Sequence, residues 1–154
     1  MEQAQQLRVA VQRFVRSFGL LASDQTPCGT PISTSYAHAL VVLLERGQRG
    51  ERSTQQELGE ALGIDKSNVA RLCAKLQRAG HATQQRSVSD GRARLLALTA
   101  AGRRLAERVQ AASRDQFARL LAALPSDETR ASVVAALQAL NGALATSHEL
   151  EKRK

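Results

Sequence analysis

Hydrophobic residues recur every three or four positions along most of the chain, which is the spacing of amphipathic helices. Residues 2–18 show this spacing first, with apolar side chains at Leu7, Val11, Phe14, Val15 and Phe18. The same spacing, with turn residues between the stripes, predicts further helices over residues 34–47, 54–62, 66–79, 99–123 and from 127 to near the C-terminus. The pattern therefore predicts a mainly α-helical fold.

Residues 53–80, STQQELGEALGIDKSNVARLCAKLQRAG, have the pattern of a helix-turn-helix. Thr54 and Glu57 have the spacing of a capping box at the start of a short helix. Gly63 follows that helix at once and suits a sharp turn, because glycine adopts positive φ angles without strain. Asp65 is a favourable N-cap for the next helix, and Gly80 suits the position just after its end.

Two short strands are expected between Gly80 and Thr99, where the helical spacing stops. A turn around Asp90 and Gly91 would join them into a β-hairpin, the wing of a winged helix-turn-helix domain. The expected class is mainly α (α+β). Its three expected parts are an N-terminal dimerisation helix and loop (1–32), a winged helix-turn-helix DNA-binding domain (33–99) and C-terminal dimerisation helices (100–154).

The charge of the chain narrows the class of partner. The 154 residues carry a formal charge of +8, and residues 52–104 hold ten basic side chains against four acidic ones, which places +6 of that charge on the helix-turn-helix and wing. Such a surplus favours nucleic acid or an anionic membrane surface. Aromatic residues make up only 3% of the chain. Proteins that bind single strands need aromatic side chains on which bases stack, so double-stranded DNA is the favoured partner.

Several other classes are disfavoured. The sequence has no run of about 18 apolar residues, so a membrane-spanning helix is not expected. The N-terminus does not have the pattern of a signal peptide, and two cysteines cannot form a disulfide scaffold, so we expect a cytoplasmic protein. The motifs of enzymes, bound cofactors and zinc sites are missing from the sequence, so we expect no enzyme, no cofactor and no metal.

The second helix of a helix-turn-helix lies in the major groove of DNA. Helical geometry places Val69, Leu72, Cys73 and Leu76 on its inward face. Arg71 can bond guanine O6 and N7, Asn68 can pair with adenine, and Ala70 can touch a thymine methyl group. The predicted DNA-binding set on and beside this helix is Thr54, Lys66, Ser67, Asn68, Ala70, Arg71, Lys75 and Arg78, with Lys75 and Arg78 more suited to phosphates. The alternative is a solvated basic face on an ordinary helix.

The wing supplies a second candidate contact. Asp90 stands two residues before Arg92 at the expected hairpin tip and can hold its guanidinium extended toward a narrow minor groove. Arg94 would lie on the same side of the strand as Arg92, because side chains alternate along a strand. The alternative is a surface salt bridge at a turn, worth about 0–1 kcal/mol.

Three stretches follow one another in a characteristic order: T-x-x-E-L-x-x-x-L-G, S-N-V-A-R-L-x-x-K-L-x-x-A-G, and D-G-R followed by L-T-x-x-G. With this order and spacing, residues 33–109 resemble the winged-helix domain of the MarR family of transcriptional regulators. The resemblance implies a homodimer formed by the first and the last two helices, two wings that reach the minor groove, and a pseudo-palindromic operator. One departure is His81-Ala82-Thr83-Gln84, where the family usually has two aliphatic residues and then basic ones.

Members of this family commonly respond to small anionic aromatic molecules, metals or oxidants. In this chain Tyr36 and His38 are candidates to line an effector cleft, although a packed or surface position suits each of them as well. Cys28 lies in a Gly/Pro-containing loop and is a candidate redox sensor, with an ordinary loop thiol as the alternative. Cys73 lies on the inward face of its helix and is interpreted as a core residue.

The sequence therefore predicts a cytoplasmic, homodimeric regulator that binds specific double-stranded DNA, interpreted as a repressor relieved by a small-molecule effector or an oxidant. Two alternatives stay open: an architectural DNA-binding protein that tolerates many sequences, and an interaction module whose basic face binds an acidic protein.

Overall fold

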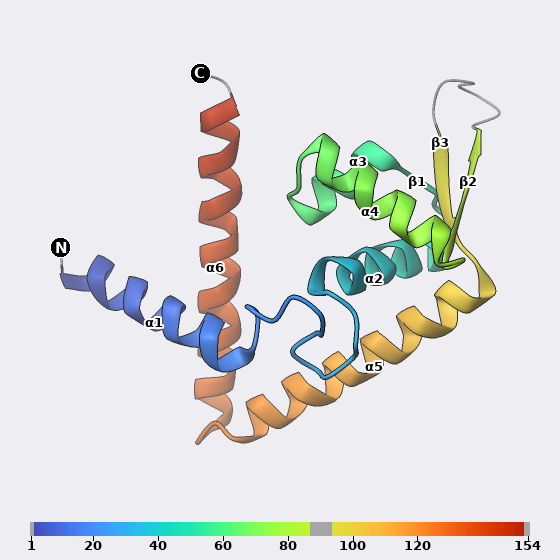
Figure 1. The fold of residues 1–154 in the computed structure, drawn as a ribbon. Helices are drawn as coiled ribbons and strands as arrows, with labels where there is room; N and C mark the ends of the chain where they lie inside the picture. The colour runs from blue at the N-terminus through green and yellow to red at the C-terminus, as the bar shows by residue number, and fades with distance from the viewer. Residues whose placement is uncertain (1, 87–93, 153–154) are drawn as a thin grey trace. The chain divides into compact units, whose positions relative to one another are not determined.

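The computed structural model describes residues 2–86 and 94–152, with side-chain surroundings up to residue 147 (Figure 1). The elements in these ranges, in chain order, are α1 (Glu2–Phe18), α2 (Thr34–Gln48), β1 (Ser53–Thr54), α3 (Gln55–Leu62), α4 (Lys66–Arg78), β2 (Ala82–Arg86), β3 (Arg94–Leu98), α5 (Ala100–Ala122) and α6 (Asp127–Lys152). The mainly α, winged-helix arrangement predicted from the sequence is confirmed.

One predicted helix end was wrong, and one strand was missed. Gly47 does not end α2, because the helix continues through Gln48 and the chain turns at Gly50, where φ is +74°. The strand β1 was not predicted. It contains only two residues, and its existence depends on pairing with the distant β3, so no local alternation of polar and apolar residues could indicate it.

The sheet has three antiparallel strands in the order β1-β3-β2. Strands β2 and β3 form the two sides of the wing, and their pairing runs from Ala82 opposite Leu98 to Arg86 opposite Arg94. The predicted turn at Asp90 and Gly91, together with Arg92, lies outside the described residues. Strand β1 pairs with β3 at Ser53, which attaches the start of α3 to the wing.

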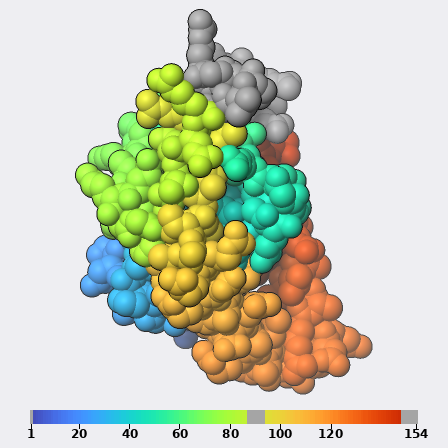
Figure 2. Space-filling model, turned by 90° about the vertical axis from the view of Figure 1, so that its right-hand side faces the viewer, coloured from blue at the N-terminus to red at the C-terminus, as the bar shows by residue number. Residues whose placement is uncertain are grey.

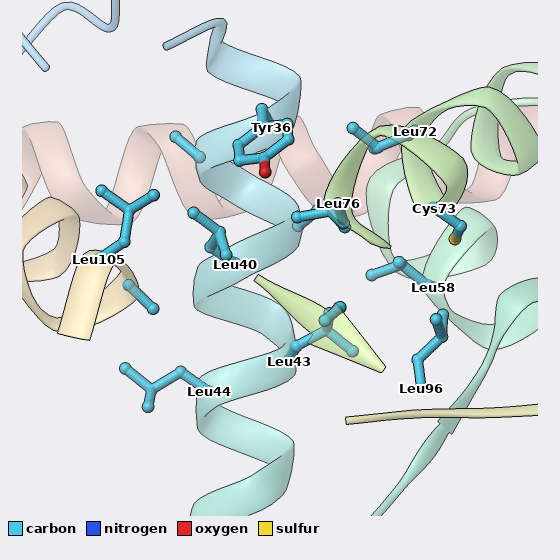
Figure 3. Close-up of a cluster of buried hydrophobic side chains, with 14 of the residues drawn as sticks. Tyr36, Leu40, Leu43, Leu44, Leu58, Leu72, Cys73, Leu76, Leu96 and Leu105 are labelled. Carbon is cyan, nitrogen blue, oxygen red and sulfur yellow. The ribbon is translucent and has the colours of Figure 1, made fainter. Parts of the chain in front are cut away.

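The hydrophobic core lies around α2 (Figure 3). Helix α2 contributes Leu40, Leu43 and Leu44, and the side chains that surround them come from α3, α4, β3 and the first half of α5. All four residues predicted for the inward face of α4 are buried: Val69, Leu72, Cys73 and Leu76. This packing fixes which face of α4 remains exposed.

The chain divides into two compact units, Met1–Arg114 and Asp115–Lys154. Within the second unit, the Arg130 side chain donates to the carbonyl oxygen of Leu121 at 3.0 Å and pairs with Asp127. The functional division at residues 32/33 and 99/100 stays a prediction. Among the described residues, no helix combines the length and the apolar character needed to cross a membrane.

Candidate nucleic-acid interface

The helix-turn-helix is formed by α3, Gly63 and α4. At the start of α3 the predicted capping box is present: Glu57 Oε2 accepts from the Thr54 backbone N–H at 2.7 Å, and Thr54 Oγ1 accepts from the Glu57 backbone N–H at 3.1 Å. The backbone hydrogen bond from Thr54 lowers the pKa of Glu57. Gly63 has a φ of +64°, which only glycine adopts readily, so α4 begins after a tight turn.

Close packing sets the position of α4 on α3. Gly59 is buried, and a Cβ atom placed on it would lie 3.2 Å from Val69 Cγ1. The two helices therefore approach closely at this glycine. The helical spacing of residues 54–62 predicts an inward Ala61, but Ala61 is exposed, and Gly59 occupies the contact with α4.

Asp65 holds the first turn of α4. Its Oδ1 atom accepts from the backbone N–H groups of Ser67 and Asn68, each at 2.9 Å, and from the Ser67 hydroxyl at 2.7 Å. These bonds, with the backbone N–H of Asn68 as the largest contribution, lower the pKa of Asp65 to about 2. The carboxylate is therefore charged at neutral pH, and its negative charge interacts favourably with the positive end of the helix dipole.

The outward face of α4 carries polar and basic side chains, and the green side chains of this helix reach the surface in Figure 2. Its exposed residues are Lys66, Ser67, Asn68, Arg71, Ala74, Lys75 and Arg78, and Ala70 is half-buried. A helix with one buried apolar face and one exposed basic face can enter the major groove and meet both base edges and phosphates. The residues predicted on α4 thus share its outward face, and all of them except the half-buried Ala70 are exposed.

Within this face three side chains form a line. Asn68 Nδ2 donates to Asp65 Oδ2, and Arg71 Nη2 donates to Asn68 Oδ1 at 2.5 Å. The amide of Asn68 is therefore held between a carboxylate and a guanidinium.

Two members of the predicted DNA-binding set have other contacts. The Thr54 hydroxyl is engaged in the capping box and also donates to Glu57 Oε2 at 3.1 Å. Lys75 Nζ lies 5.5 Å from the centroid of the Tyr36 ring, a cation–π distance. In this structure both side chains contact the protein itself.

The two candidate effector-binding residues are not together. Tyr36 is buried, 3% exposed, whereas His38 on the same helix is exposed. The Tyr36 hydroxyl is hydrogen-bonded to Nδ1 of His81 at 2.6 Å, and burial raises the pKa of Tyr36. The phenol therefore stays protonated at neutral pH and already has a partner.

Cys28 is half-buried in the loop between α1 and α2. Its Sγ atom lies 3.0 Å from Thr26 Oγ1 and 3.8 Å from Thr30 Oγ1. Desolvation raises the pKa of the Cys28 thiol, but the hydrogen bonds of Thr26 and Thr30 outweigh it, and the net result is a lowered pKa. Cys73 is buried in the core as predicted, and burial raises its pKa.

On the wing, Arg94 is exposed at the start of β3. Asp90 and Arg92, the other two predicted wing residues, lie outside the described residues. Among the side chains the structure describes, no group of three or more His, Cys, Asp or Glu could hold a metal ion.

Sequence reasoning missed a junction between the end of α4 and the start of α5. The Thr99 hydroxyl donates to the Gly80 carbonyl at 2.7 Å, and the Thr99 backbone N–H donates to the His81 carbonyl at 3.0 Å. A Cβ atom on Gly102 would lie 1.9 Å from that same carbonyl oxygen, so only glycine fits there. The signal in the sequence was L-T-x-x-G, whose threonine and glycine both serve this junction.

Arg46 was also missed. Its Nη1 atom donates to Ser53 Oγ at 3.3 Å and lies 3.5 Å from Glu57 Oε2. It connects α2 to the start of the helix-turn-helix.

Comparisons with known proteins agree with this architecture. Residues 30–93 match the family model of the MarR family. A search of curated protein sequences returned no match. Among solved structures, the chain is similar to a probable transcriptional regulator from Pseudomonas aeruginosa, with 28% identity, 87% of this chain and 92% of that chain covered, and a TM-score of 0.66.

Two further structures share the fold. MepR of S. aureus, solved as a complex with DNA, is 24% identical over 73% of this chain and 80% of that chain, with a TM-score of 0.65. BpsR of Bordetella bronchiseptica, solved to explain how 6-hydroxynicotinic acid regulates its DNA binding, is 20% identical over 92% of this chain and 99% of that chain, with a TM-score of 0.67. The family match over residues 30–93, together with the shared fold around them, shows that this chain is similar to regulators of the MarR family.

Proposed function

We propose that this protein is a transcriptional regulator that binds a specific sequence of double-stranded DNA as a homodimer. The observation that carries the proposal is the division of α4 into two faces. Four residues of one face are buried in the core, and the other face exposes Arg71, Asn68 and several lysine and arginine side chains. Such a helix can place an arginine against the edge of a guanine while its neighbours contact phosphates.

The relatives support this proposal. MepR has been solved with DNA bound, and its fold is shared by this chain. In the present chain Lys66 and Arg78 lie at the two ends of α4, where the two backbones of a major groove would pass, and Arg71 lies between them. We assign Arg71 to base contact and Lys66 and Arg78 to phosphate contact. Arg92 and Arg94 are proposed for the minor groove.

The homodimer is proposed from exposed apolar side chains. Helix α1 has no buried residue, and its apolar side chains Leu7, Val11 and Phe14 are 45%, 46% and 42% exposed. On α6, Val133, Val134, Leu137 and Leu144 are 38–57% exposed. Large exposed apolar faces in a soluble chain mark contact surfaces. A second copy of the chain covers them in the proposed dimer, and binding to two half-sites one turn of DNA apart would require about 34 Å between the two α4 helices.

In the proposed function, a small anionic molecule or an oxidant weakens DNA binding and thereby relieves repression. BpsR supports the first of these, since 6-hydroxynicotinic acid regulates its DNA binding. In the present chain a ligand that binds the Tyr36 hydroxyl would have to compete with its hydrogen bond to His81 or share the hydroxyl with it. Cys28, whose thiol pKa is lowered, is the candidate for oxidation.

The test is selection of bound sequences from a pool of random duplexes, followed by titration of the selected duplex and a scrambled duplex over a range of salt concentrations. A specific regulator is expected to prefer the selected duplex by about 10³-fold or more. Arg71→Ala should reduce this preference, and Arg108→Ala, which removes the same charge from exposed α5 surface, should not. Equal affinity for all duplexes would indicate an architectural protein, and no duplex binding at low salt would leave an interaction module.

A further inference from the structure

We propose that Asn68 is a positioning residue for Arg71 and does not itself read a base. This inference rests on the proposed recognition of duplex DNA by α4. It concerns which of the two side chains determines sequence preference. The spacing of the two residues on an exposed helix face permits either role for Asn68, so its hydrogen bonds decide between them.

The three residues involved are spaced three apart on α4. Asp65, Asn68 and Arg71 therefore lie one above another on neighbouring turns of the helix, all exposed. Asp65 Oδ2 accepts from Asn68 Nδ2, and Asn68 Oδ1 accepts from Arg71 Nη2 at 2.5 Å. The line runs from the cap of the helix to the arginine proposed for base contact.

The orientation of the Asn68 amide follows from the charges on either side. The reverse orientation would place the amide oxygen against a carboxylate and the NH₂ group against the guanidinium, and both contacts would be repulsive. Asp65 is charged throughout the working pH range because the backbone N–H groups of the first turn stabilise its carboxylate. The Asn68 oxygen is therefore directed to Arg71.

Reading adenine requires both atoms of the asparagine amide, one to accept from N6 and one to donate to N7. Each amide atom of Asn68 keeps one further hydrogen-bonding site, but the bonds to Asp65 and Arg71 fix the amide plane, and turning it to an adenine edge would strain two charge-assisted hydrogen bonds. Arg71 is in a different situation. A guanidinium carries five N–H donors, and Asn68 uses one of them, so a bidentate contact with guanine O6 and N7 remains available.

Holding Arg71 in place has a physical benefit. A free arginine side chain loses rotamer entropy when it is fixed. A side chain that is already held before DNA arrives loses less, which strengthens the contact with the correct base. We therefore expect one G·C pair in each half-site to depend on both residues, and no A·T pair to depend on Asn68.

The experiment compares base preferences of the full-length wild type, Asn68→Ala, Arg71→Ala and the double variant by selection from random duplexes, with affinities measured on the selected duplex. Arg71→Ala is expected to reduce affinity about 5- to 150-fold and to relax one G·C position. Asn68→Ala should relax the same position. The affinity of the double variant for the selected duplex should lie within about 2-fold of that of Arg71→Ala.

Two further variants separate positioning from other roles. Arg108→Ala, which removes an exposed arginine from α5 outside the predicted DNA-binding set, is the control and should leave the preference at the Arg71 position intact. Asn68→Asp keeps an oxygen for Arg71 but cannot donate to adenine, and its second oxygen replaces the hydrogen bond to Asp65 with a repulsion that weakens the cap. The positioning role predicts that this variant retains the guanine preference while binding all duplexes more weakly.

Loss of preference at a separate A·T position in Asn68→Ala, or additive losses in the double variant, would overturn the positioning role. An unchanged profile in Asn68→Ala beside a relaxed one in Arg71→Ala would overturn it too, with the proposed function intact. A wild-type protein that selects no sequence at all would instead remove the proposed function, and this inference with it.

Discussion

The hydroxyl of Tyr36 and Nδ1 of His81 are hydrogen-bonded at 2.6 Å, which joins the first turn of α2 to the residue that follows the C-terminal turn of α4. The two rings meet edge to face, with 5.9 Å between their centroids. His81 is one of the residues that depart from the usual family pattern. In this chain it makes a specific structural contact, and Ala82 beside it is buried in the core.

Tyr36→Phe removes this hydrogen bond and keeps the ring. We expect the free energy of unfolding to fall by about 1 kcal/mol. His81→Ala should cost more, about 1–3 kcal/mol, because it leaves a buried hydroxyl without a partner. Chemical denaturation measures both values, with His38→Ala on the exposed side of α2 as the control. Additive effects of the two substitutions in the double variant would show that the contact contributes no coupling.

Gly102→Ala should destabilise the protein, since the new Cβ atom would lie 1.9 Å from the His81 carbonyl oxygen and the start of α5 would have to move. Overpacking of this kind costs about 1–3 kcal/mol. The matched control is Gly142→Ala in α6, where nothing lies within 4 Å of the new methyl group. That variant should gain about 0.5–1 kcal/mol from helix propensity. Equal stabilities of the two variants would contradict the close contact at Gly102.

Cys28 should react faster with iodoacetamide than Cys73. The thiolate is the reactive form, and Cys28 has a lowered pKa and partial exposure, whereas burial raises the pKa of Cys73. The ratio of the two rates should increase as the pH falls from 9, because the thiol with the lower pKa keeps the larger thiolate fraction. Mass spectrometry of the labelled peptides at pH 6 to 9 measures both rates. Thr30→Val removes one hydroxyl near the sulfur and should slow the reaction of Cys28 with iodoacetamide. Faster labelling of Cys73 would contradict this prediction.

Leu137→Glu should convert the proposed dimer into a monomer, because it places a charge in the apolar stripe of α6, where Leu137 is 49% exposed in the isolated chain. Ala135→Glu adds the same charge on the opposite side of the helix and should leave the mass unchanged. Light scattering coupled to size-exclusion chromatography measures the mass of each variant. If wild type and both variants are all monomeric, the exposed stripe does not form a dimer.

Features decided within a few residues could be predicted from the sequence. The capping box at Thr54, the N-cap at Asp65 and the turn at Gly63 each depend on neighbours at most four positions away, and all three are present. The buried face of α4 followed from helical spacing alone. Asp65, Asn68 and Arg71 are three positions apart in the sequence, but this spacing does not indicate which of their atoms form hydrogen bonds.

Features that join distant segments could not be predicted. Tyr36 and His81 are 45 residues apart, and nothing in either neighbourhood indicates the other. Strand β1 exists because β3 pairs with it, and Gly102 is required because the His81 carbonyl approaches it. In each case the physical reason is a tertiary contact, and local propensity carries no information about such contacts.

The hydrogen bonds of Thr99 to the carbonyl groups of Gly80 and His81 have a mechanical consequence. The end of α4 and the start of α5 cannot separate without breaking both bonds, so the two helices must turn together about this joint. Helix α5 has 23 residues and is about 34 Å long at 1.5 Å per residue. In the proposed homodimer, a small tilt of α5 would therefore change the spacing of the two α4 helices, and with it the half-site separation that the protein tolerates.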